Sequence, residues 1–361
     1  MEIIHLITTI NRGGAENQLI QMLSEQCKNH KNISIIYLKG DGYWKSWLQK
    51  NSIICFGPIF PNGNYLSFMG LLRLFIILRR FKNYLIHMHM PPSLFLGFII
   101  RFFTLRQSKF IYTSHNDEPI IPNVFLDKLF SRYLLNMPNN IIAISEAVKI
   151  FLIKKYNIKS KKITTINYGF DKSTYPYMNK KNHFSELDYL DKKYIYIGTV
   201  ARLVEQKRID LLIESFQYFK KEFNLKVKLV IIGSGHLSKS LKNYSLKKGI
   251  EDSIIWIDQT NYVLDHMRNW DLFCLTSEYE GFGLVLLEAL SVGLPILAMK
   301  TSSIKEIIGP CGLVVDYGNT IEFAKAIKEI LDKPKKFINK NYIKNFSLKK
   351  NMISHFKIYF D

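Results

Sequence analysis

Residues 194–222 read YIYIGTVARLVEQKRIDLLIESFQYFKKE. The stretch opens with an apolar run, Tyr194–Val200, which predicts a buried β-strand, and it closes with apolar side chains at helical spacing over Arg208–Glu222. A strand that leads through a short loop into a helix is the first part of a βαβ unit, and such units build parallel sheets. The stretch therefore predicts an α/β fold.

The same alternation of apolar runs and helical patterns continues along both halves of the chain. Further helical patterns cover Glu16–Lys28 and Leu284–Val292. Two such series predict two Rossmann-like domains, each with a doubly wound parallel sheet, facing a cleft at the carboxyl ends of their strands. We expect strands at Ile3–Thr8, Ile33–Tyr37, Ile53–Phe56, Leu85–His89, Phe110–Thr113, Ile141–Ile144, Ile163–Ile166, Tyr194–Val200, Lys228–Ile232, Ile254–Ile257, Leu272–Leu275 and Pro295–Ala298.

Chain length and one polar stretch set the expected domain boundaries. The 361 residues suit two domains, since domains usually contain roughly 100–200 residues. Residues 172–192 are polar and lack a sustained period, which is typical of a linker. We therefore expect a first domain over 1–171, a second domain over 193–340 and a C-terminal segment over 341–361.

The charge of the chain is strongly positive and unevenly distributed. The net charge is +20, and residues 1–180 carry 23 Lys and Arg against nine Asp and Glu, a net charge of +14. The first half should therefore face an anionic partner, and nucleic acid, an acidic membrane surface and a phosphorylated substrate are the candidates.

The cysteines and the longest apolar stretches indicate the compartment. The four cysteines are far apart and form no CxxC pair, which disfavours a zinc ribbon or a redox motif and suits a reducing cytosol. MEIIHLITTI is expected to form a buried first strand rather than a signal peptide. No apolar stretch reaches the roughly 18–20 residues of a membrane span, so we expect a cytoplasmic protein.

The segment SEYEGFGLVLLEALSVGLP, residues 277–295, carries the most informative chemistry. Glu280 precedes Gly281, Phe282 and Gly283, and a helical pattern then begins at Leu284. Glycines allow close approach of a ligand, and the unsatisfied N–H groups that open a helix suit a phosphate. We expect Glu280 to accept from a sugar hydroxyl.

Glu288 lies in the helical part of this segment, where it is expected to hold a ribose. The alternative is an ordinary turn with a solvated glutamate. However, Glu288 stands among apolar residues, where a carboxylate needs a partner.

Three further segments place basic or glycine residues directly after predicted strands. Arg202 and Lys207 follow the strand at Tyr194–Val200, where two cations can neutralise a diphosphate leaving group. Gly14 in NRGGAE and Gly233 in IIGSG can approach phosphates, although neither segment completes GxGxxG and both are compatible with plain helix-entry turns.

Histidines follow two strands of the predicted first domain. His115 and Asn116 lie in YTSHN, where a histidine can bind a sugar or stabilise charge. His87 and His89 alternate and therefore share one strand face, but a metal site needs a third ligand that the sequence does not reveal. We expect no metal site and a cleft-lining or packing role for the pair.

Taken in order, these segments resemble the retaining, B-type (GT-B) glycosyltransferases of family four, the glycogen-synthase-like, glycosyl transferases group 1. The resemblance is carried by VARLVEQKRID and the Glu280-x7-Glu288 pair, with NRGGAE, HMHMPPS, YTSHN, AISEAV, INYGFD, IIGSG and CGLVV in support. The family often has Gly-Gly before the glutamate that is here Glu306, and this chain has TSSIKE instead.

The resemblance implies a nucleotide-sugar-dependent hexosyltransferase without a metal or other cofactor. It implies an acceptor-binding first domain, a nucleotide-sugar-binding second domain and a last helix that returns to the first domain. The donor is expected to be UDP- or GDP-linked, and catalysis is assigned to Glu280, His115, Arg202 and Lys207. Donor contacts are assigned to Gly14, Arg202, Lys207, Gly233, Glu280, Gly281, Phe282, Gly283, Leu284 and Glu288.

The acceptor is expected to be a glycan or a lipid-linked glycan of a bacterial surface polysaccharide, such as capsule, O-antigen or lipopolysaccharide. Acceptor contacts are expected from Glu16, His89 and Asn116 in the basic first domain. Leu66–Lys82 is apolar with basic residues, which is typical of a helix in a membrane interface or of a core helix with basic ends. Peripheral binding to the inner face of an anionic membrane is therefore one hypothesis. A nucleotide-sugar epimerase and, more distantly, a nucleic-acid-binding protein are the alternatives.

Overall fold

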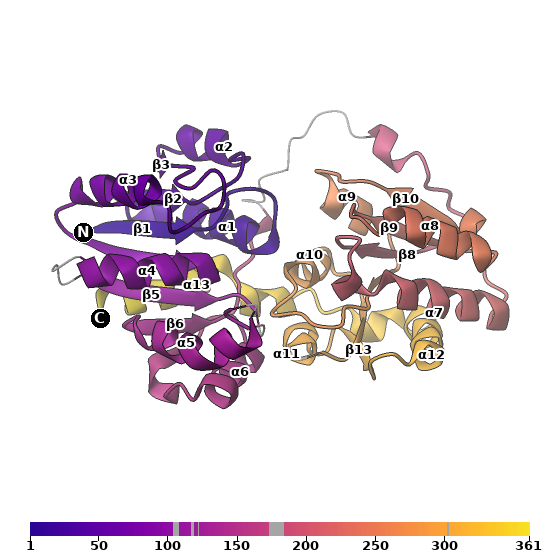
Figure 1. Ribbon diagram of the computed structural model, residues 1–361. Helices are drawn as coiled ribbons and strands as arrows, with labels where there is room; N and C mark the ends of the chain where they lie inside the picture. The colour runs from indigo at the N-terminus through magenta and orange to yellow at the C-terminus, as the bar shows by residue number, and fades with distance from the viewer. Residues whose placement is uncertain (104–107, 117–118, 122, 173–183, 302) are drawn as a thin grey trace. The chain divides into compact units, whose positions relative to one another are not determined.

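The computed structural model of the protein describes residues 1–361 except 104–107, 117–118, 122, 173–183 and 302. The chain forms two compact units, of which the first comprises Met1–Gly169 and Ser347–Asp361 and the second comprises Phe170–Phe346 (Figure 1). Each unit contains one parallel sheet with helices around it. The predicted α/β fold with two Rossmann-like domains is therefore confirmed.

The first unit is built on a seven-stranded parallel sheet in the order β3-β2-β1-β4-β5-β6-β7. Its central strands are buried along their length because helices cover both faces, which explains why they read as continuous apolar runs. The strands are β1 (Glu2–Ile7), β2 (Ile33–Tyr37), β3 (Ile54–Phe56), β4 (Tyr84–His89), β5 (Lys109–Ser114), β6 (Asn140–Ala143) and β7 (Ile163–Thr165).

The helices of the first unit divide between the two faces of this sheet. The strands step from β1 to β3 in one direction and from β4 to β7 in the other, and parallel crossovers are right-handed. Consequently α1 and α2 cover one face, α3 to α6 cover the other, and α13 packs beside α1 (Figure 1). The helices are α1 (Gly14–Asn29), α2 (Lys45–Lys50), α3 (Phe68–Arg79), α4 (Pro91–Phe103), α5 (Val124–Asn136), α6 (Glu146–Tyr156) and α13 (Leu348–Phe360).

The second unit is built on a six-stranded parallel sheet in the order β10-β9-β8-β11-β12-β13. Helices α7 and α12 pack together over it and bury Phe216, Phe219 and Phe323 in its core. The strands are β8 (Ile195–Val200), β9 (Val227–Ile232), β10 (Ile254–Ile257), β11 (Leu272–Leu275), β12 (Ile296–Met299) and β13 (Gly312–Val315). The α-helices are α7 (Ile209–Glu222), α8 (Ser238–Lys247), α9 (Val263–Met267), α10 (Leu284–Val292), α11 (Ile304–Ile308) and α12 (Thr320–Asp332).

Side-chain caps fix the start of several helices. Asn123 accepts from the N–H of Leu126 at the start of α5, and Ser145 accepts from the N–H of Val148 at the start of α6. Such caps satisfy N–H groups that have no partner within the helix. Helix α10 follows Gly283 and has no side-chain cap.

One strand and the unit boundaries differ from the expected ones. Strand β13 was not predicted; it is a four-residue edge strand that begins with Gly312, and glycine is depleted in strands. The second unit extends to Phe346 rather than 340, since Phe346 packs edge-on against Phe282 with ring centroids 6.0 Å apart.

The expected linker is only partly described, since 173–183 lie outside the described residues. The end of the expected linker packs on the second unit, where the Tyr189 hydroxyl accepts from the Trp270 indole at 3.2 Å. Within the described residues, none of the helices combines the length and the apolar character that a membrane crossing requires.

Candidate active site

The loops after β8, β9 and β11 meet at one edge of the second sheet. Strands β9, β8 and β11 are neighbours, and the strand order reverses between β8 and β11. Ligands of doubly wound sheets bind at such a switch point, beyond the carboxyl ends of the strands. Arg202 and Lys207 follow β8, Gly233 follows β9, and Glu280 to Leu284 follow β11, so the predicted donor-binding residues share this edge.

Hydrogen bonds join the segment after β8 to the segment after β11. The N–H of Glu278 donates to the Gln206 carbonyl at 2.8 Å, and the Gln206 amide donates to the Tyr279 carbonyl at 3.0 Å. The Thr276 hydroxyl donates to the carbonyl of Lys207 at 3.1 Å. The two motifs that are specific in the sequence therefore form one continuous structure.

Lys207 and Glu280 form an ion pair within this structure. The Lys207 Nζ lies 2.5 Å from the Glu280 Oε1, and the side chains are only 14% and 10% exposed. The Ser277 hydroxyl donates to the same oxygen at 2.8 Å. The pair fixes the direction of the carboxylate, and it shares the charge of Lys207 with Glu280 rather than leaving it to a diphosphate alone.

Ser303 holds the backbone of the same loop from another strand. Its hydroxyl donates to the carbonyl of Glu280 at 2.7 Å, and its side chain is buried. Ser303 follows β12 and stands in the segment TSSIKE, where the resembled family often has glycine. Neither Ser277 nor Ser303 was among the predicted site residues, and the departure from Gly-Gly was the only sequence signal for Ser303.

Arg202 and the start of α10 supply positive potential at this edge. Arg202 is exposed, and its guanidinium has no ion pair or hydrogen bond with any described residue. Gly283 adopts a φ of +80°, a left-handed conformation that favours glycine, and it opens α10 without a side-chain cap. A free cation and an uncapped helix start both suit an anion.

Phe282 and Glu288 face the interior of the second unit. The Phe282 ring is buried and anchors the glycine turn against Phe346. Glu288 lies in α10 between the buried residues Leu287 and Ala289 and is 6% exposed. The side chain is therefore buried, and its contact with a ribose stays a prediction.

The glycines after β9 are required by packing against the segment after β8. A Cβ on Gly233 would lie 1.9 Å from the Ala201 carbonyl oxygen, and one on Gly235 would lie 2.2 Å from that of Leu203. The Leu203 N–H donates to the Ser234 carbonyl at 2.9 Å. This close packing is enough to require glycine at position 233, even if no ligand binds there. The role of Gly233 in donor binding therefore also stays a prediction.

The first unit holds the predicted residues Gly14 and Glu16 after β1. Gly14 is exposed, and a Cβ there would meet no atom within 4 Å. Glu16 turns back toward its own loop, where its Oε1 accepts from the Thr9 hydroxyl at 2.5 Å. Gly14 is therefore open to a ligand, whereas an acceptor would have to share the Glu16 carboxylate with Thr9.

A row of hydrogen-bonded side chains crosses the first sheet on the side of α1 and α13. The Tyr168 hydroxyl lies 2.5 Å from the His115 Nδ1, and the His115 Nε2 lies 3.3 Å from the His89 Nδ1. The His89 Nε2 lies 3.1 Å from the His5 Nδ1, and the His5 Nε2 lies 2.9 Å from the Gln26 Oε1. We call these five side chains the histidine row.

One set of neutral tautomers satisfies the whole histidine row. The Gln26 amide oxygen can only accept, so His5 carries its proton on Nε2 and accepts on Nδ1. His89 and His115 then each donate from Nε2, and the Tyr168 hydroxyl donates to His115. Both ring nitrogens of His89 and of His115 are thus used within the protein, which leaves neither nitrogen for the direct acceptor or sugar contact that was expected.

Asn116, the remaining predicted acceptor residue, follows His115 and is exposed. Its carbonyl accepts from the Ser114 hydroxyl at 3.3 Å. Among the expected acceptor residues it is therefore the one whose side chain faces solvent, and its contact with an acceptor stays a prediction.

Burial keeps these histidines neutral. It lowers the pKa of His5 to about 3, that of His115 to about 3 and that of His355 to about 4. The pKa values of His87 and His89 are well below the usual range because of burial and the neighbouring imidazoles. Neutral rings are consistent with the tautomers of the histidine row.

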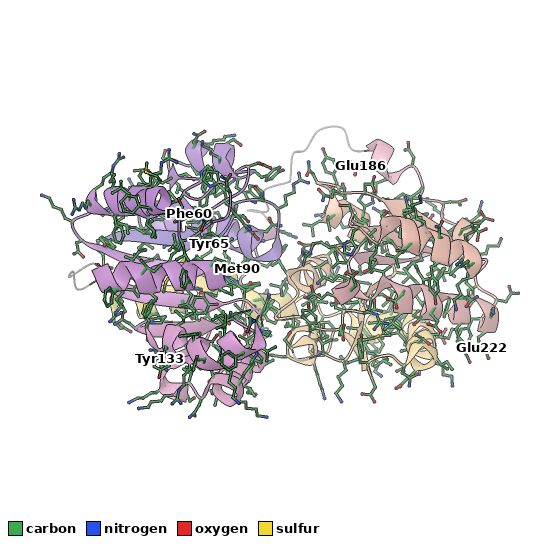
Figure 2. The ribbon with its side chains drawn as sticks, in the orientation of Figure 1. Phe60, Tyr65, Met90, Tyr133, Glu186 and Glu222 are labelled. Carbon is green, nitrogen blue, oxygen red and sulfur yellow. The ribbon has the colours of Figure 1, made fainter. Side chains whose placement is uncertain are left out.

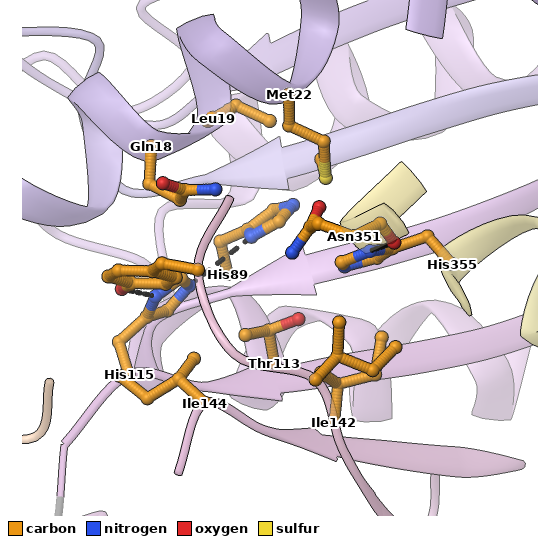
Figure 3. Close-up of a pocket in the computed structure, with 12 residues that line it drawn as sticks. Gln18, Leu19, Met22, His89, Thr113, His115, Ile142, Ile144, Asn351 and His355 are labelled. Atoms are coloured by element: carbon orange, nitrogen blue, oxygen red, sulfur yellow. Dashed lines mark hydrogen bonds between the residues drawn. The ribbon is translucent and has the colours of Figure 1, made fainter. Parts of the chain in front are cut away.

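A small cavity adjoins the histidine row in the first unit. Figure 3 shows His89, His115 and His355 on the wall of this cavity of about 20 Å³. The Asn351 Oδ1 is buried here and has no hydrogen-bond partner among the described residues. A cavity of this size, measured this way, holds about one water molecule, which would satisfy that oxygen.

His5 supplies the third imidazole that the sequence did not reveal beside His87 and His89. Ligand atoms of the three lie within 4.8 Å of one another, because His5 pairs with His87 across β1 and β4. The His87 Nδ1 lies 2.7 Å from the Tyr359 hydroxyl, and its Nε2 lies 2.6 Å from the Thr113 hydroxyl. All three rings therefore have protein hydrogen-bond partners.

Comparison with known proteins agrees with this architecture. Residues 12–174 match the model of Glycosyltransferase Family 4, and residues 180–346 match that of Glycosyl transferases group 1. An uncharacterized glycosyltransferase of Haemophilus influenzae is 32% identical over 148 residues, which span 39% of this chain and 41% of that protein. The chain thus matches less than half the length of this relative.

Two further proteins are similar over longer stretches. The capsular polysaccharide biosynthesis glycosyltransferase CapM of Staphylococcus aureus is 27% identical over 278 residues, which span 73% of this chain and 71% of that protein. The crystal structure of HepE from Anabaena, in complex with UDP-glucose, has a TM-score of 0.81 at 20% identity and covers 99% of both chains. The two family matches, together with the two parallel-sheet units, show that the chain belongs to the glycosyltransferases of group 1 and family 4 and has the GT-B fold.

Proposed function

We propose that the protein transfers a sugar from a UDP- or GDP-linked donor to a glycan or lipid-linked acceptor during the synthesis of a bacterial surface polysaccharide. The observation that carries this proposal is the Lys207–Glu280 pair, which lies after the same neighbouring strands, β8 and β11, that Arg202 and the uncapped start of α10 follow. The similarity to CapM supports a polysaccharide pathway, and that to HepE, which was solved with UDP-glucose, supports a nucleotide-sugar donor.

The residues at this edge match the charges that a glycosyl transfer develops. The bond between the anomeric carbon and the donor phosphate breaks, and the diphosphate leaves with its electrons. Arg202, Lys207 and the first N–H groups of α10 stabilise that charge. Glu280, oriented by Lys207 and Ser277, accepts from a donor hydroxyl. These groups supply the stabilisation without a bound metal or other cofactor.

We infer that the anomeric configuration is retained. In a front-face transfer, the acceptor oxygen attacks from the side that the phosphate leaves, and the acceptor proton passes to the departing phosphate oxygen. The resemblance to retaining enzymes supports this course. The four free cysteines support a place in the reducing cytoplasm, where nucleotide sugars would be used.

Nucleotide binding and transfer test this function directly. We expect UDP or GDP to raise the melting temperature of the protein, because a ligand that binds only the folded state stabilises it. A donor that matches should then lose its sugar to an acceptor with retention, measured by NMR of the product. Epimerised donor without acceptor would instead identify an epimerase, and salt-sensitive binding of DNA or RNA without nucleotide binding would identify a nucleic-acid-binding protein.

A further inference from the structure

Helix α5 exposes several large apolar side chains, whereas two polar side chains are buried together with Leu134 and Leu135. Its exposed large apolar residues are Val124, Phe125, Leu126, Leu129, Phe130 and Tyr133, and Val124 and Phe125 are 81% and 74% exposed. Asp127 and Ser131, by contrast, are buried. A surface helix normally shows the opposite arrangement, so this face of α5 requires an explanation.

Contacts of the buried polar residues fix the rotation of α5. The Asp127 Oδ1 accepts from the Ser131 hydroxyl at 2.6 Å and from the Ile121 N–H at 3.0 Å. The Tyr156 hydroxyl donates to Asp127 at 3.0 Å, and the Lys155 Nζ lies 2.8 Å from the Asp127 Oδ2. Turning the apolar face inward would break these bonds and leave a carboxylate without partners, so the apolar face is held outward.

Helix α3 exposes apolar side chains at the same edge of the first sheet. Phe68 and Met69, in its first turn, are 76% and 63% exposed. Both helices cover the same face of the sheet, and each follows the carboxyl end of a strand, β3 for α3 and β5 for α5. Tyr133, farther along α5, also points away from the sheet (Figure 2). Phe68, Met69, Val124 and Phe125 therefore lie in the first turns of helices that follow the carboxyl ends of strands, whereas Phe102, which is 76% exposed, lies in the last turn of α4.

The exposed charged residues of these two helices are all cationic. Lys128 and Arg132 on α5 and Arg73 and Arg79 on α3 are exposed, and Asp127 is the only carboxylate of either helix. Apolar side chains flanked by Lys and Arg suit an anionic bilayer, in which each cation near the surface adds to binding. A second copy is disfavoured, because it would place the same cations face to face.

We propose that the first unit docks on an anionic lipid bilayer through the first turns of α3 and α5. The aromatic and aliphatic side chains enter the headgroup region, while Lys128 and Arg132 contact lipid phosphates. Docking places the carboxyl edge of the first sheet at the bilayer surface, where a lipid-linked acceptor would present its sugar. This acceptor role rests on the proposed function, whereas the docking surface itself does not.

Flotation of the full-length protein with vesicles tests this surface. We expect wild-type protein to float with phosphatidylcholine vesicles that contain phosphatidylglycerol and to bind weakly to phosphatidylcholine alone. The double substitution Val124→Ser/Phe125→Ser should weaken binding about tenfold or more, because two large apolar groups lose their burial. Lys128→Glu/Arg132→Glu should weaken binding to the anionic vesicles by about tenfold or more.

The matched control removes two exposed apolar residues from the second unit. Leu246→Ser/Ile321→Ser changes side chains that are 60% and 48% exposed, and it should float like the wild type. Wild-type protein that fails to float, or a Val124→Ser/Phe125→Ser variant that floats unchanged, overturns the proposal. A dimer in sedimentation that this variant dissociates would assign the face to a second copy and also overturn it.

The same variants separate this proposal from the proposed function. Val124→Ser/Phe125→Ser should keep the wild-type shift of melting temperature with UDP or GDP, because the nucleotide site is assigned to the second unit. A protein that floats but binds neither nucleotide would keep the docking surface and lose the proposed sugar transfer. A protein that binds nucleotide but does not float would overturn the docking surface and leave the proposed sugar transfer standing.

Discussion

The Nζ of Lys207 lies 2.5 Å from the Oε1 of Glu280, across 73 positions of the sequence. The two residues follow β8 and β11, the neighbouring strands between which the strand order of the second sheet reverses. The pair joins the two most specific motifs of the chain and sets the direction of the carboxylate that is proposed to contact the donor sugar.

Neutralising Glu280 should impair transfer. Glu280→Gln keeps the size of the side chain but removes the charge that holds Lys207, so both groups lose their orientation. We expect kcat to fall by about a hundredfold or more, as for other groups that stabilise a transition state. Steady-state kinetics with a matched donor measures this change. The exposed neighbour Glu278→Gln serves as the control, and a Glu280→Gln enzyme within a few-fold of wild type would refute the assignment.

Removing the Arg202 guanidinium should weaken stabilisation of the diphosphate. Arg202→Ala should lower kcat/KM by about a hundredfold, because a cation aimed at developing charge is lost. Arg202→Lys should recover only part of the lost kcat/KM, since an ammonium group cannot bind two phosphate oxygens at once as a guanidinium can. Lys300, which is also exposed in the second unit, provides the control as Lys300→Ala. Equal losses in both variants would indicate a general charge effect.

Ser303 should act by positioning Glu280. Ser303→Gly removes the hydrogen bond to the Glu280 carbonyl, and we expect about 1 kcal/mol of lost stability. If the loss of this bond shifts the loop, the KM for the donor rises even at temperatures at which the variant is still fully folded. Ser303→Thr, which keeps a hydroxyl, should recover part of the donor affinity. A Ser303→Gly enzyme with unchanged KM would make the contact purely structural.

The buried histidines should make the protein sensitive to acid. Burial lowers the pKa of His5, His87, His89, His115 and His355 below the value of 6.5 for an ordinary histidine. The unfolded chain therefore binds more protons, so the stability is fully present above pH 6.5 and is lost as the pH falls from there toward 4. Each histidine contributes up to about 1.4 kcal/mol per pH unit in this range.

Urea unfolding at pH 7.5 and pH 5.5 measures this dependence. We expect the free energy of unfolding to drop by several kcal/mol at the lower pH. His236 is largely exposed in the second unit, and His236→Asn should leave the difference between the two pH values unchanged. Equal stability at both pH values would show that the five histidines are not held neutral in the folded state.

Chelation should leave transfer intact. The rings of His5, His87 and His89 are hydrogen-bonded to protein groups, and the proposed transfer draws its positive charge from Arg202, Lys207 and α10. We therefore expect the enzyme to keep its rate after EDTA treatment and dialysis, with metal content measured by mass spectrometry. A loss of rate that zinc restores would instead identify a metal at the three histidines.

The strand pattern could be predicted from the sequence, but the register could not. Apolar runs located strands such as Ile33–Tyr37 and Leu272–Leu275 because buried parallel strands are apolar on both faces. The short edge strand Gly312–Val315 lacked that signal. His5 was missed beside His87 because sequence alone does not say that β1 pairs with β4 or that these two residues are opposite each other.

Side-chain direction was the other feature that the sequence left open. The pattern of Leu66–Lys82 indicated an interfacial or a core helix, whereas the sequence predicted no interfacial role for α5. Its spacing shows two faces but not which one turns inward, and contacts to Lys155 and Tyr156 decide this for Asp127.

By itself, the sequence determined a two-domain parallel α/β protein with cationic and glycine-rich loops after its strands, because these features depend on local pattern and residue type. Tertiary structure alone decided that Lys207 pairs with Glu280, that His89 and His115 bind each other rather than solvent, and that α5 turns its apolar face outward. Each of these depends on which distant segments become neighbours, and only the packing of the sheets and helices fixes that.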